Sequence, residues 1–387
     1  MRIALVTDSY YTRYAREKDV AAHVSILAEG LFYIGHDVMV ILPEAGRSET
    51  EADGNVLKCS GRRAANMDGV QMTKSGSQQM EEKLNAFHPD IVHIHTLSES
   101  GAFGLQYADD HDITSLLTIH SLWDTEKSGH TFSPVALLRE RTRIDVAEFV
   151  LKHANHLAVL TESMAQRLED DGPREADLIF PFAVDTRFYN IGASSPLHKR
   201  ALREALSLED KKIVVCGDCR DTRTLLRFLD SWKKVFMQDD SFYLFVLNRK
   251  SQTKALLSHI HSLRLSNRVA LIGEYQPDDI ASCFALSCCY VSCSHSEELS
   301  LSAPEAAACG TPLLVPSGSG TSIVVQEGQN GFCWTKEEDL FALIHKFSRV
   351  SGAGKNALTN LVTGSIRPFT PYNQAYAAEA VYLSLLN

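Results

Sequence analysis

Short buried strands alternate with helical segments along the chain, and this alternation limits its possible folds more than any other feature. Ile3 to Thr7 is an aliphatic and β-branched run with no solvated face, and a helical apolar pattern follows it and ends at Gly35. Val38 to Leu42 is a second such run. A buried strand, a crossover helix and a second buried strand form a βαβ unit, which implies a parallel sheet.

The same unit recurs on both sides of one break. In the first half the further predicted strands are Ile91 to His95, Ser115 to His120 and His156 to Leu160. After a stretch of small and turn-forming residues at Asn190 to Pro196, strands are predicted at Ile213 to Cys216, Phe242 to Leu247, Val269 to Ile272, Cys289 to Ser292 and Pro312 to Pro316.

This order of elements predicts an α/β protein with two Rossmann-like domains that face each other across a ligand cleft. We place the domains at residues 1–190 and 191–368, and we expect an aromatic helix at 369–387 to return to the first domain. A length of 387 residues agrees with two or three domains.

Charge and hydropathy exclude several classes of function. The 38 Lys and Arg against 48 Asp and Glu give a net charge of -10, which opposes binding to nucleic acid. No apolar run is long enough to span a bilayer, and the chain begins with a strand rather than a signal peptide. We therefore expect a soluble, cytoplasmic protein.

Nine cysteines, an odd number, fit thiols kept reduced in the cytosol. Cys216 and Cys219 form a C-x-x-C without a second ligand pair or a thioredoxin-like setting. We interpret the cysteines as buried small hydrophobic residues and predict no metal site.

Glu297 and Glu305 carry the densest chemical signal. Glu297 falls in the loop after a predicted strand and Glu305 in the first turns of the next helix, so both can face a ligand at the start of that helix. A diphosphate suits such a place, and the carboxylates can accept hydrogen bonds from ribose and sugar hydroxyls. The simpler alternative is an amphipathic helix with solvated glutamates.

The segment from Glu297 to Pro312 resembles the E-x7-E signature of the family 4 (group 1) retaining glycosyltransferases, which have the GT-B fold. Other stretches, in the same order along the chain, also look like landmarks of that family: Ala28 to Val38, Pro89 to Thr96, Leu117 to Trp123, Val184 to Phe188 and Gly328 to Phe332.

The resemblance implies roles for particular residues. Glu297 would contact hydroxyls of the donor sugar, and Glu305 would hold the ribose of the nucleotide. His120 would lie beside the transferred sugar, with a capping or core histidine as the alternative. The residues between the two glutamates, Leu299, Ser300 and Leu301, are further candidates for donor binding.

The loop expected to bind the donor diphosphate departs from the family pattern. In the family this loop reads G-R-x-x-x-x-K-G, and here Asp218 stands at the arginine position and Arg223 at the lysine position. Arg220 and Arg223 are the candidates that resupply positive charge, with a solvated helix start as the alternative. The first loop has Lys18 and Asp19 where the family usually has two glycines.

The activity implied is transfer of a hexose from a UDP- or GDP-sugar to a hydroxyl of a lipid or glycan, with retention of configuration and without a cofactor or essential metal. The first domain would be the acceptor side and the second would bind the nucleotide sugar. Arg13, Arg16 and Lys18 offer a small basic cluster for peripheral contact with the inner membrane face. The altered loop leaves one alternative, an inactive homologue that serves as a binding or partner subunit. A nicotinamide-dependent dehydrogenase is excluded because no G-x-G-x-x-G follows the first strand.

Overall fold

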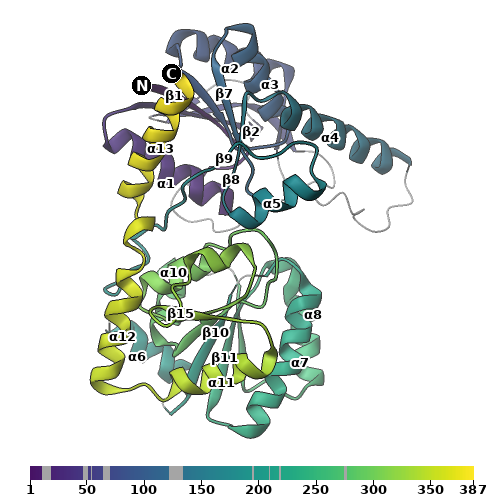
Figure 1. The fold of residues 1–387 in the computed structure, drawn as a ribbon. Helices are drawn as coiled ribbons and strands as arrows, with labels where there is room; N and C mark the ends of the chain where they lie inside the picture. Colours follow the sequence, from purple (N-terminus) through teal and green to yellow (C-terminus); the bar gives the residue numbers. More distant parts are fainter. Residues whose placement is uncertain are drawn as a thin grey trace. The chain divides into compact units, whose positions relative to one another are not determined.

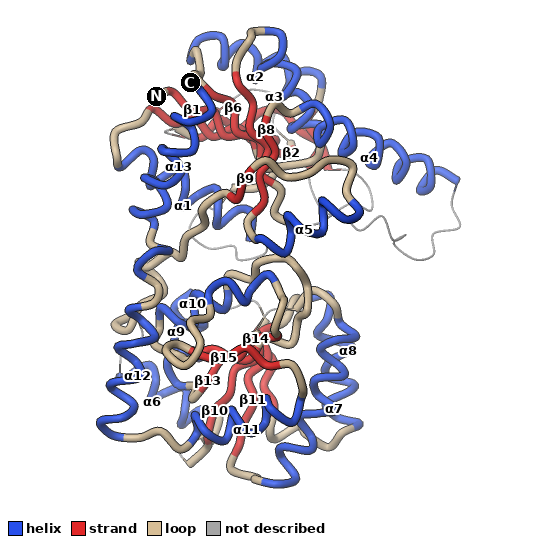
Figure 2. Tube along the Cα trace, viewed as in Figure 1, coloured by secondary structure: helices blue, strands red, loops and turns tan. Residues whose placement is uncertain are grey.

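The computed structural model describes residues 1–10, 19–46, 51–53, 55–63, 70–121, 134–193, 196–208, 210–217, 219–273 and 277–387. These residues divide into two compact units. The first is Met1–Ala183 together with Pro371–Asn387, and the second is Val184–Thr370. Each unit contains a sheet with helices packed around it (Figures 1 and 2).

The sheet of the first unit has the strand order β3-β4-β2-β1-β6-β7-β8-β9, and β5 pairs with β4. Its pairs are parallel except β3 with β4 and β4 with β5, which are antiparallel. The strands are β1 (Arg2–Val6), β2 (Asp37–Ala45), β3 (Glu51–Asp53), β4 (Val56–Arg63), β5 (Val70–Met72), β6 (Ile91–Ile94), β7 (Thr114–Thr118), β8 (His156–Val159) and β9 (Leu178–Ile179).

The helices of this unit include the last one in the chain. They are α1 (Asp19–Tyr33), α2 (Lys74–Phe87), α3 (Glu99–Asp110), α4 (Pro134–His153), α5 (Glu162–Asp171) and α13 (Pro371–Leu386). Helix α13 packs beside α1 (Figure 1). Gly30 allows this close approach, because a Cβ atom there would lie 2.9 Å from the carbonyl oxygen of Pro371.

The second unit has a parallel sheet in the order β12-β11-β10-β13-β14-β15. All six residues of β11 are buried, as expected for a parallel strand covered on both faces. The strands are β10 (Lys212–Cys216), β11 (Phe242–Leu247), β12 (Val269–Ile272), β13 (Cys289–Val291), β14 (Leu313–Pro316) and β15 (Gly331–Trp334).

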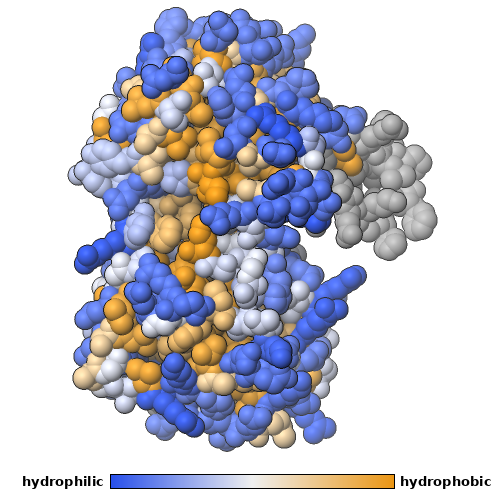
Figure 3. Space-filling view, viewed as in Figure 1, coloured by the Kyte–Doolittle hydropathy of each residue, from blue (hydrophilic) through white to orange (hydrophobic). Residues whose placement is uncertain are grey.

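Helices cover both faces of that sheet (Figure 2). Trp232 of α7 and Phe242 of β11 are both fully buried in the core between helix and sheet. Hydrophilic residues predominate on the visible surface around α8 (Figure 3), although Leu257 of this helix is exposed. The helices are α6 (Pro196–Ala205), α7 (Thr222–Gln238), α8 (Lys250–Ser262), α9 (Pro277–Leu286), α10 (Ser302–Ala308), η1 (Gly320–Val324), α11 (Glu337–Ser348), α12 (Gly352–Gly364) and η2 (Arg367–Phe369).

The predicted α/β class with two parallel-sheet domains is confirmed. The chain leaves the first unit after Ala183, earlier than residue 190, where the sequence analysis ends that domain. The reason is local packing: the Val184 N–H donates to the carbonyl oxygen of Phe369 at 2.9 Å, and the ring of Tyr189 lies 6.2 Å from that of Phe284. Both contacts are made within the second unit.

Candidate functional site

Glu297 and Glu305 lie where the sequence analysis places them, one in a loop and one on the helix after it. Glu297 is half-buried in the loop between β13 and α10. Glu305 is in the first turn of α10 and is buried, with 8% of its surface exposed. Leu299 and Leu301 are also buried, and Ser300 between them is half-buried. Each of the two carboxylates can accept hydrogen bonds from hydroxyl groups, and a buried carboxylate such as that of Glu305 needs such partners.

Gly320 and Thr321 of η1 contact the backbone of the Glu297 loop. A side chain at Gly320 would overlap the carbonyl oxygen of Glu297, so only glycine allows this contact. The N–H of Gly320 also donates to the carbonyl oxygen of Ser296 at 2.9 Å, and the N–H of Ser300 donates to Thr321 Oγ1 at 3.0 Å. The loop therefore has a fixed backbone next to the two glutamates.

A chain of hydroxyls connects this loop with the start of the phosphate-loop candidate after β10. The hydroxyl oxygens of Tyr290 and Ser302 are 2.8 Å apart, as are those of Ser302 and Ser300. A side chain at Gly217 would overlap the Tyr290 hydroxyl. Because Tyr290 is fully buried, these hydrogen bonds satisfy a hydroxyl group that would otherwise be costly to bury.

The structure describes Arg220 and Arg223, and they differ in their surroundings. Nη1 of Arg220 lies 2.9 Å from Oε2 of Glu298, so this arginine is already engaged by a carboxylate. Arg223 is exposed in the first turn of α7. Asp221 caps that helix by accepting from the N–H groups of Arg223 and Thr224, each at 3.1 Å. Although burial raises the pKa of Asp221, the hydrogen bonds from Thr224 and Arg223 and the Arg223 charge lower it overall.

Several residues that the sequence analysis names lie outside the described part of the chain. Asp218, at the expected arginine position, is one of them, and so are Arg13, Arg16 and Lys18 of the first loop. Asp19 begins α1, with its backbone alone described.

The cysteines of the C-x-x-C are both buried and lie near a third thiol. Cys216 Sγ is 3.9 Å from Cys293 Sγ, and Cys219 also contacts Cys293. Hydrogen bonding with Cys293 and burial raise the pKa of the Cys219 thiol, and hydrogen bonding with Cys216, with burial, raises that of Cys293. Protonated buried thiols are poor nucleophiles, which fits their interpretation as small hydrophobic residues.

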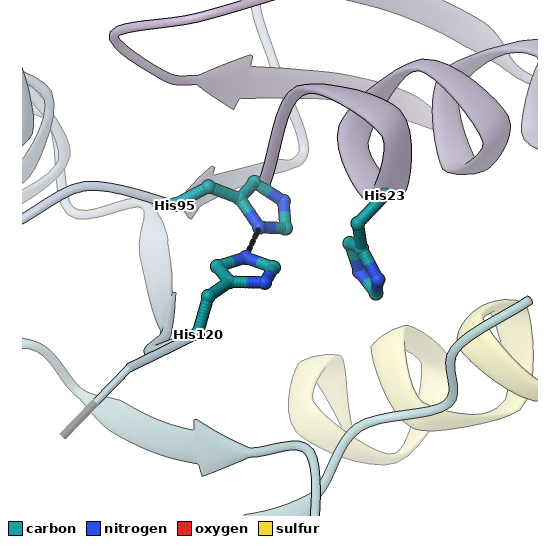
Figure 4. A group of neighbouring side chains, drawn as sticks. All are labelled: His23, His95 and His120. Carbon is teal, nitrogen blue, oxygen red and sulfur yellow. Dashed lines mark hydrogen bonds between the residues drawn. The ribbon is translucent and has the colours of Figure 1, made fainter. Parts of the chain in front are cut away.

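His120 lies in a group of buried histidines in the first unit. It follows β7, and its Nε2 is 3.0 Å from Nδ1 of His95, which follows β6 (Figure 4). His23 of α1 completes the group, with its ring 4.7 Å from that of His120 in an edge-on arrangement. His93 on β6 packs against His95 with ring centres 3.9 Å apart.

Burial keeps His23, His93 and His95 neutral. It lowers the pKa of His23 to about 4. Burial, followed by neighbouring histidines, also lowers the pKa of His93 and that of His95 well below the usual value. His93 is bonded at both nitrogens, at 2.7 Å to the Tyr382 hydroxyl of α13 and at 2.8 Å to Oγ1 of Thr118.

His23, His95 and His120 each offer a ring nitrogen within 4.8 Å of the others, which is the spacing of a metal-binding trio. A metal-bound histidine normally donates its second ring N–H to a carbonyl or carboxylate. Here Nε2 of His95 and both nitrogens of His23 have no hydrogen-bond partner within the described ranges. Such second partners are therefore not seen for His23 or for Nε2 of His95 in the part of the chain that the structure describes.

Sequence reasoning missed His23, His93 and His95 as a group with His120. The H-x-H at the end of β6 was the available signal, because alternate residues of a strand share one face. Gly320, Thr321 and Tyr290 were also missed, since their contacts with the glutamate loop come from segments that are separate in the sequence.

The two sheets and the helices around them have the fold of one class of protein, the GT-B glycosyltransferases. Over the whole chain the fold is similar to sucrose-phosphate synthase from Thermosynechococcus elongatus, with a TM-score of 0.74 and 16% identity, covering 99% of this chain and 98% of that one. Anabaena HepE in complex with UDP-glucose is similar with a TM-score of 0.69 and 15% identity, covering 99% of this chain and 100% of that one.

Family models make the assignment more specific. Residues 20–188 match Glycosyltransferase Family 4, and residues 199–352 match Glycosyl transferases group 1. The chain belongs to this glycosyltransferase family and is an enzyme of that class. Among curated relatives, alpha-monoglucosyldiacylglycerol synthase of Acholeplasma laidlawii is 22% identical over 402 residues, covering 100% of this chain and 98% of the relative.

A helix that crosses a bilayer must be both long and apolar. None of the helices in the described ranges meets both requirements for a membrane span.

Proposed function

We propose that the protein transfers a hexose from a UDP- or GDP-sugar to a hydroxyl group, with retention of configuration. The observation that carries this proposal is the pair of carboxylates in the second unit: Glu305 is buried in the first turn of α10, and Glu297 lies in the braced loop eight residues earlier. In the proposed complex Glu305 accepts hydrogen bonds from the ribose, and Glu297 accepts them from the transferred sugar.

The leaving diphosphate needs positive charge, because negative charge builds up on it as the glycosidic bond breaks. Arg223 is the first candidate since it is exposed at the start of α7. Arg220 is the second, and it would exchange Glu298 for phosphate oxygens. We propose that these side chains stabilise the leaving diphosphate without a cofactor or essential metal. We also propose that His120 of the first unit contacts the transferred sugar.

The acceptor proposed first is a lipid hydroxyl, with a glycan hydroxyl as the second choice. This order rests on the Acholeplasma laidlawii relative, whose name states a glucosyl group on diacylglycerol in the alpha configuration. The UDP-glucose complex of the similar Anabaena structure supports the nucleotide-sugar donor. The first unit would be the acceptor side, and a cytoplasmic protein acting on a lipid would touch the inner membrane face peripherally.

A donor screen tests the proposal. The purified chain is incubated with UDP-glucose, UDP-galactose or GDP-mannose and with vesicles containing diacylglycerol, and both nucleotide release and glycolipid are measured. We expect one donor to give a product of retained configuration by proton NMR, with activity unchanged by EDTA. Glu338→Ala, an exposed position on α11, is the control for Glu305→Ala. No transfer with any donor, together with unchanged binding of UDP or GDP by Glu305→Ala, would refute the proposal.

A further inference from the structure

We propose that His95 is a positioning residue that fixes His120 in the tautomer with its proton on Nδ1. The inference deepens the proposed function because it specifies how His120 would meet the donor sugar. The structural part concerns the histidine pair alone, so it can be tested without any sugar.

The pair is joined by one hydrogen bond, and the direction of that bond decides the tautomer. Nδ1 of His95 and Nε2 of His120 are 3.0 Å apart, and both rings are buried. A neutral imidazole has one N–H and one lone pair. Either His95 donates from Nδ1 to His120, or His120 donates from Nε2 to His95.

The second ring nitrogen of His95, Nε2, shows which of these two tautomeric states is favoured. His95 Nε2 is buried and has no hydrogen-bond partner within the described ranges. If His120 donates, the His95 proton sits on Nε2 and becomes an orphaned buried N–H. If His95 donates, only a lone pair is left there. Orphaned buried N–H groups are rarer than unpaired acceptors, so His95 is the donor and His120 has its proton on Nδ1.

Neighbouring side chains fix the position of the His95 ring. His93 packs on it from the same strand end, and His93 is itself fixed by Thr118 and by Tyr382 of α13. Within the described ranges, the titratable groups next to the pair are His23 from α1 and His93 from β6, and Tyr382 from α13 contacts His93. Burial lowers the pKa of each of these histidines and raises that of Tyr382, so the neighbours stay uncharged.

A fixed tautomer has a chemical consequence for the sugar site. With its proton on Nδ1, His120 presents a hydrogen-bond donor, which suits a hydroxyl oxygen of the sugar. It does not act as a base through that atom. The neighbouring His95 thus decides which kind of group His120 can bind.

The first test reads the tautomer directly, by NMR of the full chain labelled with ¹⁵N in its histidine rings. His120→Gln assigns the signals. In the wild type we expect a protonated Nδ1 and an unprotonated Nε2 on His120. His95→Asn keeps a donor near the position of Nδ1 and should preserve this pattern. His95→Asp offers an acceptor and should move the proton to Nε2. His153→Asn, an exposed histidine on α4, is the control and should leave the signals in place.

A wild-type His120 protonated at Nε2, or an unchanged tautomer in His95→Asp, would overturn the proposal. The second readout is kinetic. We expect His95→Asn to keep kcat within about threefold of the wild type, and His95→Asp to lower kcat tenfold or more with a smaller change in KM for the donor. Equal activity of the Asn and Asp variants contradicts the role of the tautomer. A chain inactive with all donors would instead refute the proposed function, and the NMR result would still decide the inference.

Discussion

Arg220 and Glu298 form an ion pair that links the loop after β10 to the loop after β13, with Nη1 of the arginine 2.9 Å from Oε2 of the glutamate. The arginine side chain is 44% exposed and the glutamate side chain is 17% exposed. The pair sits between the two segments that are candidates for donor binding. A bound diphosphate would compete with Glu298 for the same guanidinium group.

Glu298→Gln should therefore strengthen binding of UDP or GDP. The change removes a competing negative charge, and a partly exposed ion pair contributes about 0.4–1 kcal/mol, which corresponds to roughly two- to fivefold in Kd. Isothermal titration calorimetry at low and high salt measures the effect. Glu338→Gln on α11 is the matched control. Weaker nucleotide binding by Glu298→Gln would show that Glu298 orients Arg220 for phosphate instead of competing for it.

Glu305→Ala and Glu297→Ala should affect different steps. Loss of the buried Glu305 should weaken nucleotide binding by about 1.5–3 kcal/mol, the range for a hydrogen bond to a charged group. Loss of Glu297 should lower kcat with little effect on nucleotide binding. Calorimetry with UDP or GDP and steady-state kinetics with the full donor separate the two. If both variants bind nucleotide as the wild type does, the assignment of Glu305 to the ribose is wrong.

Arg223→Ala should lower kcat by about a hundredfold, because loss of one group that stabilises transition-state charge has an effect of that size. Arg227→Ala, also exposed and one turn further along α7, is the control and should be near neutral. Rates of nucleotide release give the comparison. Transfer that is equally fast in both variants would show that Arg223 does not serve the diphosphate.

Tyr382→Phe should destabilise the first unit. The change leaves Nδ1 of His93 buried without its partner at 2.7 Å, at a cost of about 1–3 kcal/mol. Urea unfolding followed by circular dichroism measures the loss. Tyr372→Phe, on the exposed side of the same helix, serves as the comparison and should stay within about 0.5 kcal/mol of the wild type. Equal stability of the two variants would show that the Tyr382 hydroxyl is not important for this core.

Acid should destabilise the protein partly through His23. Its pKa in the folded state is about 4, below the value near 6.5 expected for the unfolded chain. Between these values the unfolded chain binds more protons, so stability falls as the pH drops from about 6.5 to 4, by about 3 kcal/mol from this group. His23→Leu should flatten the dependence of urea midpoints on pH in this window, whereas His153→Leu should not. Parallel curves for wild type and His23→Leu would contradict the assignment.

The strands that sequence patterns predicted have mainly apolar residues, and β4, one of the strands that were missed, shows why. β4 contains Lys58, Ser60, Gly61 and Arg62, a mixture typical of a loop. It becomes a strand by pairing with β2 in the register Val40 opposite Val56. That pairing is a property of the folded sheet, and no local pattern encodes it.

In the candidate site, too, sequence patterns revealed residues that are close in the chain and missed those that only the fold brings together. Glu297 and Glu305 are eight residues apart, so a local motif reveals them. His23, His95 and His120 meet only because α1 packs on the sheet and β6 pairs with β7. The Arg220–Glu298 pair likewise depends on β10 and β13 being neighbours in the sheet although they are far apart in the chain.

Because α13 belongs to the first unit but follows the second unit in the chain, the order of synthesis affects when each unit can be completed. The second unit is one continuous stretch, Val184–Thr370, and it is fully made before the final helix leaves the ribosome. The first unit starts at Met1 but receives Tyr382, the hydroxyl partner of His93, only from the last few residues. The first unit thus begins to be made before the second but is completed after it, and a premature stop codon after Thr370 would damage the core of the first unit rather than that of the second.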